Sequence, residues 1–187
     1  MRRIQRNRKA LSTVVTTLII LVVSVLLAGV VTLYATNITA TRTQQEMLKL
    51  TKQHVWVDGD GNSWAAVCID NVGGKDAVLD KVQVRGVEAE WSTVRFIRLS
   101  TAVTTSLISP TNDTVWTDFT YTGTSNASFT TPTMDVPLKS GDTMVLYIVD
   151  PDSINLSDVG VTIGITIFTE QSQYYVETNV ETNESAG

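Results

Sequence analysis

The sequence has few of the residues from which most metal and enzyme sites are built. Among its 187 residues there is one cysteine, Cys68, and one histidine, His54. A lone cysteine cannot close an intrachain disulfide, and the apolar neighbours of Cys68 predict a buried strand thiol rather than a reactive one. Without clusters of His or Cys, a metal site would depend on oxygen ligands alone. We therefore expect no cofactor.

Common catalytic motifs are missing as well. The sequence contains no Gly-x-Ser-x-Gly, no phosphate-binding glycine loop and no paired-cysteine motif, and His54 is the only histidine that could serve a serine as a base. No spacing singles out a pair of carboxylates for acid and base work. We expect that the chain is not an enzyme, with an extracellular hydrolase of unrecognised site as a third alternative.

Charge is absent from a long stretch near the N-terminus. Five basic residues and no acidic one lie in the first nine positions, and no charged residue occurs between Ala10 and Thr41. The chain has 14 basic residues in all, so few remain beyond this point to offset its 19 acidic residues. Nucleic acid is therefore not expected as a partner, because its phosphates would be repelled.

The uncharged stretch holds an apolar run from Leu11 to Tyr34. The run exceeds the roughly 20 residues that span a bilayer as a helix, and it is longer than the roughly 7 to 15 apolar residues of a secretory signal. Basic residues before it and acidic residues after it predict a single-pass protein with a cytoplasmic N-terminus and the remainder outside the cell. We expect the helix to continue to residue 52, because residues 39–53 contain good helix formers and no Pro or Gly.

The junction Arg8-Lys9-Ala10-Leu11 resembles the class III signal peptide of archaeal type IV pilins and archaellins, in which a basic pair and a small residue precede an apolar helix. The resemblance implies that a prepilin peptidase cuts between Ala10 and Leu11 and leaves the apolar helix on the mature protein. The glutamate that bacterial type IVa pilins carry near the fifth mature position is replaced here by Val15. An uncleaved signal anchor is the alternative.

The same resemblance implies a structural subunit of a type IV pilus-like surface filament, with adhesion as the favoured role. Copies of the helix would bundle together, and the small residues Ser24, Ala28 and Gly29 would allow close approach. The implied partners are other copies of the chain, the prepilin peptidase, an assembly ATPase with its membrane platform protein, and the membrane before assembly. The alternative from another class is a single-pass, membrane-anchored extracellular binding protein that forms no long filaments.

Beyond residue 53 the hydrophobic pattern changes to a period of two. Strands are predicted at 63–71, 77–85, 94–99, 144–149, 159–168 and 174–177. The expected fold class is α+β, with a long N-terminal hydrophobic α-helix followed by an antiparallel, immunoglobulin-like β-sandwich head. The segment Cys68–Val84, with Asn71-x-Gly73-Gly74 between two strands, resembles a hairpin of archaeal pilin heads. The expected organisation is a signal peptide at 1–10, the helix at 11–52, the head at 53–178 and a polar tail at 179–187.

Five Asn-x-Ser/Thr sequons occur in the chain, and they have meaning only if the chain is exported. Asn112, Asn126 and Asn155 adjoin turn-forming residues and are the glycosylation candidates. Asn37 is expected to be shielded in the helix. Of residues 101–134, 18 are Ser, Thr or Asn, which predicts either a hydroxyl-rich strand and loop surface or a displayed, glycosylated face.

Asp58, Asp60 and Asn62 resemble the start of a calcium-binding loop, with oxygen ligands at alternate positions. The loop lacks the bidentate glutamate, and Ser63 stands where calcium loops have glycine. A tight polar turn is the favoured interpretation, and calcium binding is the weaker one. The acidic residues between 150 and 158 have the same two interpretations.

Overall fold

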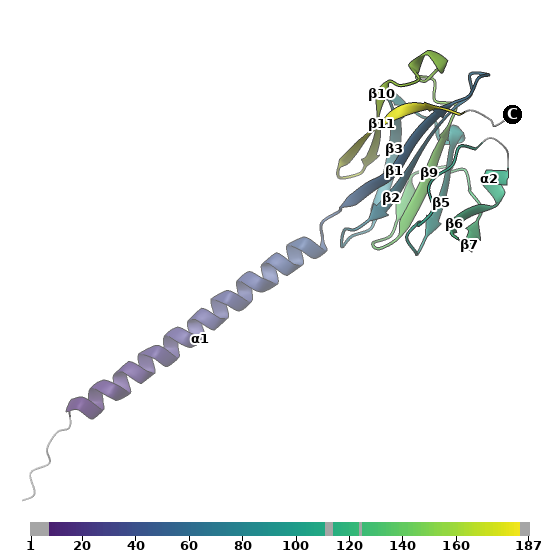
Figure 1. Cartoon of the computed structure of the whole chain (residues 1–187). Helices are drawn as coiled ribbons and strands as arrows, with labels where there is room; N and C mark the ends of the chain where they lie inside the picture. The colour runs from purple at the N-terminus through teal and green to yellow at the C-terminus, as the bar shows by residue number, and fades with distance from the viewer. Residues whose placement is uncertain (1–7, 111–113, 124, 184–187) are drawn as a thin grey trace, which may run out of the picture. The chain divides into compact units, whose positions relative to one another are not determined.

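A computed structural model describes residues 8–110, 114–123 and 125–183, and these divide into two compact units between Thr43 and Gln44. The first unit is the helix α1 (Arg8–Thr43) and the second is a β-sheet domain, hereafter the head (Figure 1). The strands of the head are β1 (Leu48–Val57), β2 (Ser63–Asn71), β3 (Ala77–Val84), β4 (Val87–Glu88), β5 (Val94–Leu99), β6 (Phe119–Thr122), β7 (Ser125–Ala127), β8 (Val136–Leu138), β9 (Thr143–Val149), β10 (Thr162–Thr169) and β11 (Gln173–Thr182). Its short helical turns are η1 (Trp91–Thr93), α2 (Thr114–Thr117) and η2 (Leu156–Asp158).

The helix α1 is formed by the apolar run, as the sequence predicts. A window of 18 residues within Leu11–Thr41 has a mean hydropathy of 2.9, and no residue of Leu11–Thr41 is buried. Hydroxyls within it bond to the preceding turn, for example Ser24 Oγ to Ile20 O at 2.6 Å and Thr32 Oγ1 to Ala28 O at 2.7 Å, so these donors are satisfied in an apolar environment. By length and composition α1 fits a membrane span, and a signal sequence near the N-terminus fits the same criterion.

The predicted end of the helix at residue 52 is wrong, because α1 ends at Thr43 and β1 begins at Leu48. Leu48 is buried, Lys49 is exposed and Leu50 is half-buried, which is the period-two pattern of a strand. Leu48 is 6% exposed within the head core. Burial in the sheet outweighs the helical propensity of the surrounding residues.

The predicted polar tail also begins too early. The last strand, β11, continues to Thr182, and Val180 within it is 2% exposed and pairs with Val55 of β1. The head therefore includes residues 179–182, as well as residues 44–52 at its other end.

The head is one curled, mixed sheet, a half-barrel, and not the antiparallel immunoglobulin-like sandwich that the sequence predicted. Strand order is β4-β3-β10-β11-β1-β2-β9-β5, with β8 also on β3. All its pairs are antiparallel except β1 with β11, which is parallel. Residues 129–138 link the two ends of the curl, since Thr130 pairs with Phe96 of β5 and β8 pairs with β3. One sheet thus buries its own aliphatic face by curling instead of packing on a second sheet.

Two apolar clusters lie on opposite faces of the sheet. The larger is enclosed by the curl and takes alternate residues from most strands, such as Val67, Leu146 and Ile165. The smaller lies on the other face of β1, β2, β9 and β5 and is covered by the Ser/Thr-rich segment through Val103, Leu107 and Phe119. β9 is consequently buried on both faces, as its continuous apolar run predicts.

The predicted thiol environment is confirmed. Cys68 belongs to the smaller cluster and is 1% exposed. Burial raises the pKa of this thiol to about 11, and the charge of Asp70 adds to the effect. A thiol of this kind is inert toward ordinary redox and alkylation chemistry.

Candidate functional site

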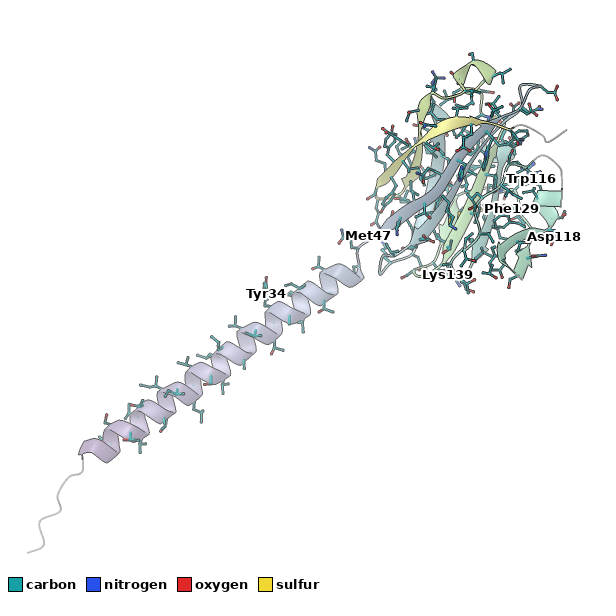
Figure 2. The ribbon with its side chains drawn as sticks, viewed as in Figure 1. Tyr34, Met47, Trp116, Asp118, Phe129 and Lys139 are labelled. Carbon is teal, nitrogen blue, oxygen red and sulfur yellow. The ribbon has the colours of Figure 1, made fainter. Side chains whose placement is uncertain are left out.

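The surface of α1 carries most of the large apolar side chains that are exposed in the described part of the chain. From Leu11 to Ile38, its large apolar side chains are between 42% and 73% exposed. Figure 2 shows these side chains projecting from all sides of the helix. A helix that is apolar all round is stable only inside a bilayer or among other apolar helices.

The predicted helix-packing residues lie within this surface. Ser24 and Ala28 are four positions apart and share one face of α1, and Gly29 is next to Ala28. A Cβ atom built at Gly29 would meet nothing within 4 Å. The small side chains leave a shallow strip on which a second helix could approach closely. Their role in packing stays a prediction.

The predicted processing site lies at the start of α1. The helix begins at Arg8, so Arg8, Lys9 and Ala10 have helical backbone and Leu11 opens the apolar stretch. Leu11 is 73% exposed. Cleavage between Ala10 and Leu11 would remove nearly one turn of the helix and leave the apolar surface intact.

The chain enters the head through residues 44–47, which are fixed by the turn after β2. The amides of Val72 and Gly73 both donate to Met47 O at 3.0 Å, and Gly74 N donates to Gln45 O at 3.2 Å. A Cβ atom at Gly73 would lie 2.5 Å from Met47 N. Only glycine fits this close backbone approach.

This turn replaces the hairpin that was expected from the segment Cys68–Val84. β2 and β3 do not pair with each other, since β2 lies between β1 and β9 while β3 pairs with β4, β8 and β10. The side chain of Asn71 is 2% exposed, and its Nδ2 donates to Lys75 O and Leu138 O while its Oδ1 accepts from Gly73 N. The Asn-x-Gly-Gly sequence thus holds residues 45–47 rather than closing a hairpin.

A buried carboxylate fixes the same entry segment from a second side. Glu46 is 9% exposed, and its Oε1 accepts a hydrogen bond from Thr169 Oγ1 at 2.6 Å. Burial raises the pKa of the neighbouring Tyr174 hydroxyl, and the Glu46 carboxylate adds to this rise. We call residues 44–47 with Gly73, Thr169 and Tyr174 the entry clamp. Sequence reasoning missed it, because its partners are more than 20 residues apart in the chain.

The candidate calcium loop is a closed polar turn. Asp58 accepts hydrogen bonds from Asp60 N at 3.1 Å, Asn62 N at 2.8 Å and Asn62 Nδ2 at 2.8 Å. These bonds, with that from the Asn62 side chain largest, lower the pKa of Asp58. Its carboxylate therefore serves as the acceptor of the turn, and no cluster of three His, Cys, Asp or Glu side chains suited to a metal occurs in the described residues. The polar-turn interpretation is the one that this geometry fits.

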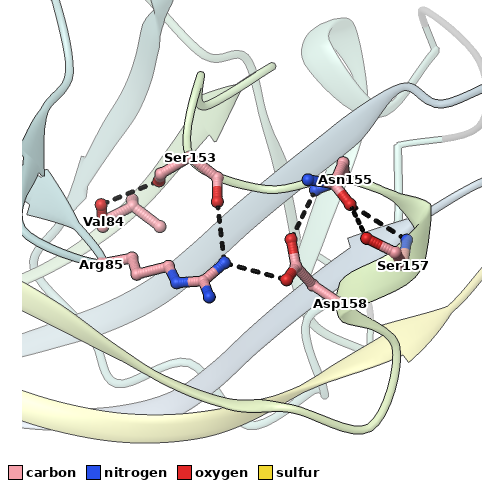
Figure 3. Close-up of polar contacts among 6 residues, drawn as sticks. All are labelled: Val84, Arg85, Ser153, Asn155, Ser157 and Asp158. Atoms are coloured by element: carbon pink, nitrogen blue, oxygen red, sulfur yellow. Dashed lines mark hydrogen bonds and ion pairs between the residues drawn. The ribbon is translucent and has the colours of Figure 1, made fainter.

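The second acidic loop is arranged around an ion pair. Asp158 is 8% exposed, and its Oδ1 accepts from Arg85 Nη1 at 2.9 Å (Figure 3). Asp150 and Asp152 instead line a separate hollow of about 310 Å³ next to β4, together with Glu88 and Glu90. The three aspartates therefore do not converge on one point.

The glycosylation candidates have different surroundings. Asn155 is exposed at the start of the turn η2, and Asn126 lies in β7 with both ends of its amide bonded to Asp118 and Thr120. Asn112 lies outside the described residues.

An aromatic group on the outer face of the sheet was not expected as a unit. The His54 ring stacks on Trp56 with centroids 5.0 Å apart, and Trp56 stacks on Tyr147 at 6.4 Å. Trp116 and Phe129, close together in Figure 2, pack edge-on against Tyr147. Beside this group a hollow of about 490 Å³ is lined by His54, Trp56, Ser109, Glu181 and Asn183. The alternation of His54 and Trp56 on one strand face was the available sequence signal.

The chain as described joins a long apolar N-terminal helix to a β-sheet domain, an architecture consistent with that of pilins. No protein-family model matches the sequence, and a search of curated proteins found no significant match.

Proposed function

We propose that this chain is a structural subunit of an archaeal type IV pilus-like surface filament. Leu11 and the residues after it form the filament core, and the head is displayed outside the cell, with adhesion as its favoured role. The prepilin peptidase, an assembly ATPase with its platform protein, and further copies of the chain are its partners. The proposal assigns the chain no catalytic activity.

The observation that carries the proposal is the uniform apolar exposure of α1. Leu11–Thr41 contains 31 residues, of which none is buried. At about 1.5 Å per residue this segment would be roughly 46 Å long, whereas a bilayer core is about 30 Å thick. A bare anchor needs only part of that length. Bundling with other copies would cover the whole surface, including the portion that lipid does not reach.

The entry clamp supports the same proposal. In a filament whose core is made of helices, any force on a head passes through the residues that follow the helix. Here Gln45, Glu46 and Met47 are held by backbone hydrogen bonds to the 72–74 turn and by the bond from Thr169 to Glu46. A flexible Gly- or Ser-rich linker would suit an anchored module that samples space freely.

The test combines two measurements on material from the producing cell. Mass spectrometry of the purified chain should give an N-terminus at Leu11, and electron microscopy of sheared surface material should show filaments that an antibody to the head labels. A mature chain that still begins at Met1, together with the absence of labelled filaments, would contradict the proposal. A chain that begins near Thr41 and is freely soluble would contradict any role for α1.

The second candidate function is a membrane-anchored extracellular binding protein. It is favoured by the hollow beside His54 and Trp56, where Glu181 and Asn183 offer polar groups next to aromatic rings. This alternative predicts that detergent releases the intact chain as a monomer and that no filament carries it.

A further inference from the structure

The loop between β9 and β10 presents one sequon in an ordered turn. Asn155 is the N-cap of η2, and Asn155, Leu156 and Ser157 are all exposed. The neighbouring Ile154 is 6% exposed and belongs to the core. The sequon therefore projects from a loop whose base is anchored in the head.

The amide of Asn155 is polarised by its own sequon. Its Oδ1 accepts hydrogen bonds from Ser157 N at 3.0 Å and from the Ser157 hydroxyl. Its Nδ2 has no hydrogen-bond partner among the described residues. Bonds to the amide oxygen draw electron density from the nitrogen, so its protons are more easily lost when the nitrogen forms a new bond.

The turn is held by the Asp158 ion pair (Figure 3). Asp158 Oδ2 accepts from Asn155 N at 3.0 Å, while Oδ1 accepts from Arg85 Nη1 at 2.9 Å. Ser153 Oγ donates to Val84 O at 2.9 Å and fixes the preceding residues to the sheet. The capping box and its supports keep Asn155 facing solvent without help from another chain.

The sequon at Asn126 is arranged differently. Its Nδ2 donates to Asp118 Oδ1, and its Oδ1 accepts from Thr120 Oγ1 at 2.8 Å. The hydroxyl of Ser128, the third residue of this sequon, donates to Thr117 O at 3.0 Å. The Asn126 amide nitrogen therefore already has a partner, and the Ser128 hydroxyl does not bond to the Asn126 side chain as Ser157 does to Asn155.

Two further sequons are also unfavourable. Asn37 lies within α1, where the Thr39 hydroxyl donates to Ala35 O at 2.9 Å. The Nδ2 atom of Asn183 is buried.

We propose that Asn155 of the head is N-glycosylated and that Asn126 is not. The donor is an oligosaccharide linked through phosphate to a lipid. Asn155 Nδ2 attacks C1 of the first sugar, the bond from C1 to the phosphate oxygen breaks, and that oxygen leaves with the bonding electron pair. Nδ2 loses one proton to a basic group of the transferase. The inference rests on the proposed function only in requiring that the head is outside the cytoplasm.

Protease mapping of the chain from its producing cell tests the site. Cleavage before aspartate yields the peptide 152–157, which contains the whole Asn155 sequon, and the separate peptide 118–134, which contains Asn126. We expect the first peptide to carry a sugar mass that fragmentation places on Asn155, and the second to have its unmodified mass. An unmodified 152–157 peptide, or a glycan on Asn126, would overturn the proposal.

Substitutions at the hydroxyl position provide the controls. Ser157→Ala should remove the glycan from Asn155, and Ser157→Thr should keep it, because a threonine hydroxyl can make the same bond. Ser128→Ala should leave the total glycan mass unchanged. A glycan that persists on Asn155 in Ser157→Ala would contradict the role of the hydroxyl.

A separate measurement distinguishes an unglycosylated Asn155 from a head that is not outside the cell. Protease treatment of intact cells reports whether the head is outside, independently of any sugar. A surface-exposed head with unmodified Asn155 overturns the glycosylation proposal alone, whereas a head protected inside the cell overturns both.

Discussion

Gly73 is the residue at which the backbone of the entry clamp is most crowded. Its substitution by alanine would place a Cβ atom 2.5 Å from Met47 N and 2.7 Å from Gln45 O, so the turn or the entry segment would have to shift. We expect Gly73→Ala to lower the free energy of unfolding by about 1–3 kcal/mol, the usual cost of overpacking. Denaturant unfolding of the wild-type and variant heads measures this difference in free energy.

Gly59→Ala is the matched control for this substitution. A Cβ atom at Gly59 meets nothing within 4 Å, so the free energy of unfolding should change by less than about 0.5 kcal/mol. Equal effects of the two substitutions would show that Gly73 is not restricted by its neighbours.

Asp58 links the stability of its turn to pH. Hydrogen bonds from Asn62 and Asp60 lower its pKa from the ordinary value of 3.8, so its contribution is complete above that pH. The contribution is lost as pH falls through the lowered value in the folded state. Unfolding of wild type and Asp58→Ala should therefore differ more at neutral pH than at a pH well below 3.8. A difference that does not change with pH would contradict this role.

At the scale of elements, α1 offers a test of helix bundling that leaves its apolar character intact. Ala28→Leu adds bulk to the strip formed with Ser24 and Gly29, and it should abolish filaments while membrane insertion remains. Val30→Leu is the control, because two positions along a helix lead to nearly the opposite face. Filament yield by electron microscopy and chain content of the membrane fraction measure the two effects. Normal filaments from Ala28→Leu would show that the strip is not a close contact.

The elements that sequence patterns predict well are those defined by local periodicity. The strand at 63–71 and the strand at 94–99 have the bounds of β2 and β5, and the run at 144–149 lies within β9. The prediction that the helix continues to residue 52 is wrong because Leu48 and Leu50 suit a strand as well as a helix. Only the pairing of this segment with β2 decides between strand and helix. The prediction of a β-sandwich is wrong for the same reason, since the curl of the sheet depends on pairs between strands distant in sequence, such as β3 with β10.

The candidate sites also differ in whether adjacent residues are enough to predict them. The apolar run of α1 and the polar turn at Asp58 are readable from adjacent residues. The capping box at Asn155 depends on Asp158, which a sequence reader could find, but also on Arg85, which lies 73 positions away. The entry clamp depends on contacts between Glu46 and Thr169, 123 positions apart, and no local pattern indicates it.

For the whole molecule, the separation into two units predicts that the head folds without α1. Both apolar clusters consist of residues from Leu48 onward, so a fragment of residues 44–187 loses none of the described core. We expect it to be soluble and to unfold cooperatively by circular dichroism. A fragment of residues 48–187 should have a lower midpoint, because it lacks the Glu46 and Met47 contacts of the entry clamp. Aggregation of the longer fragment would show that the head needs α1.

The parallel pairing of β1 with β11 places the first and last strands of the head side by side in the middle of the sheet. Until β11 has emerged from the ribosome, β1 and β10 each have an open edge, and among the described strand pairs only those of residues 129–138 connect the two halves of the sheet. The head therefore cannot complete its fold before β11 is available to pair. If the head is exported as proposed, this late closure would leave the polypeptide unfolded while it crosses the membrane, until β11 can pair with β1 and β10.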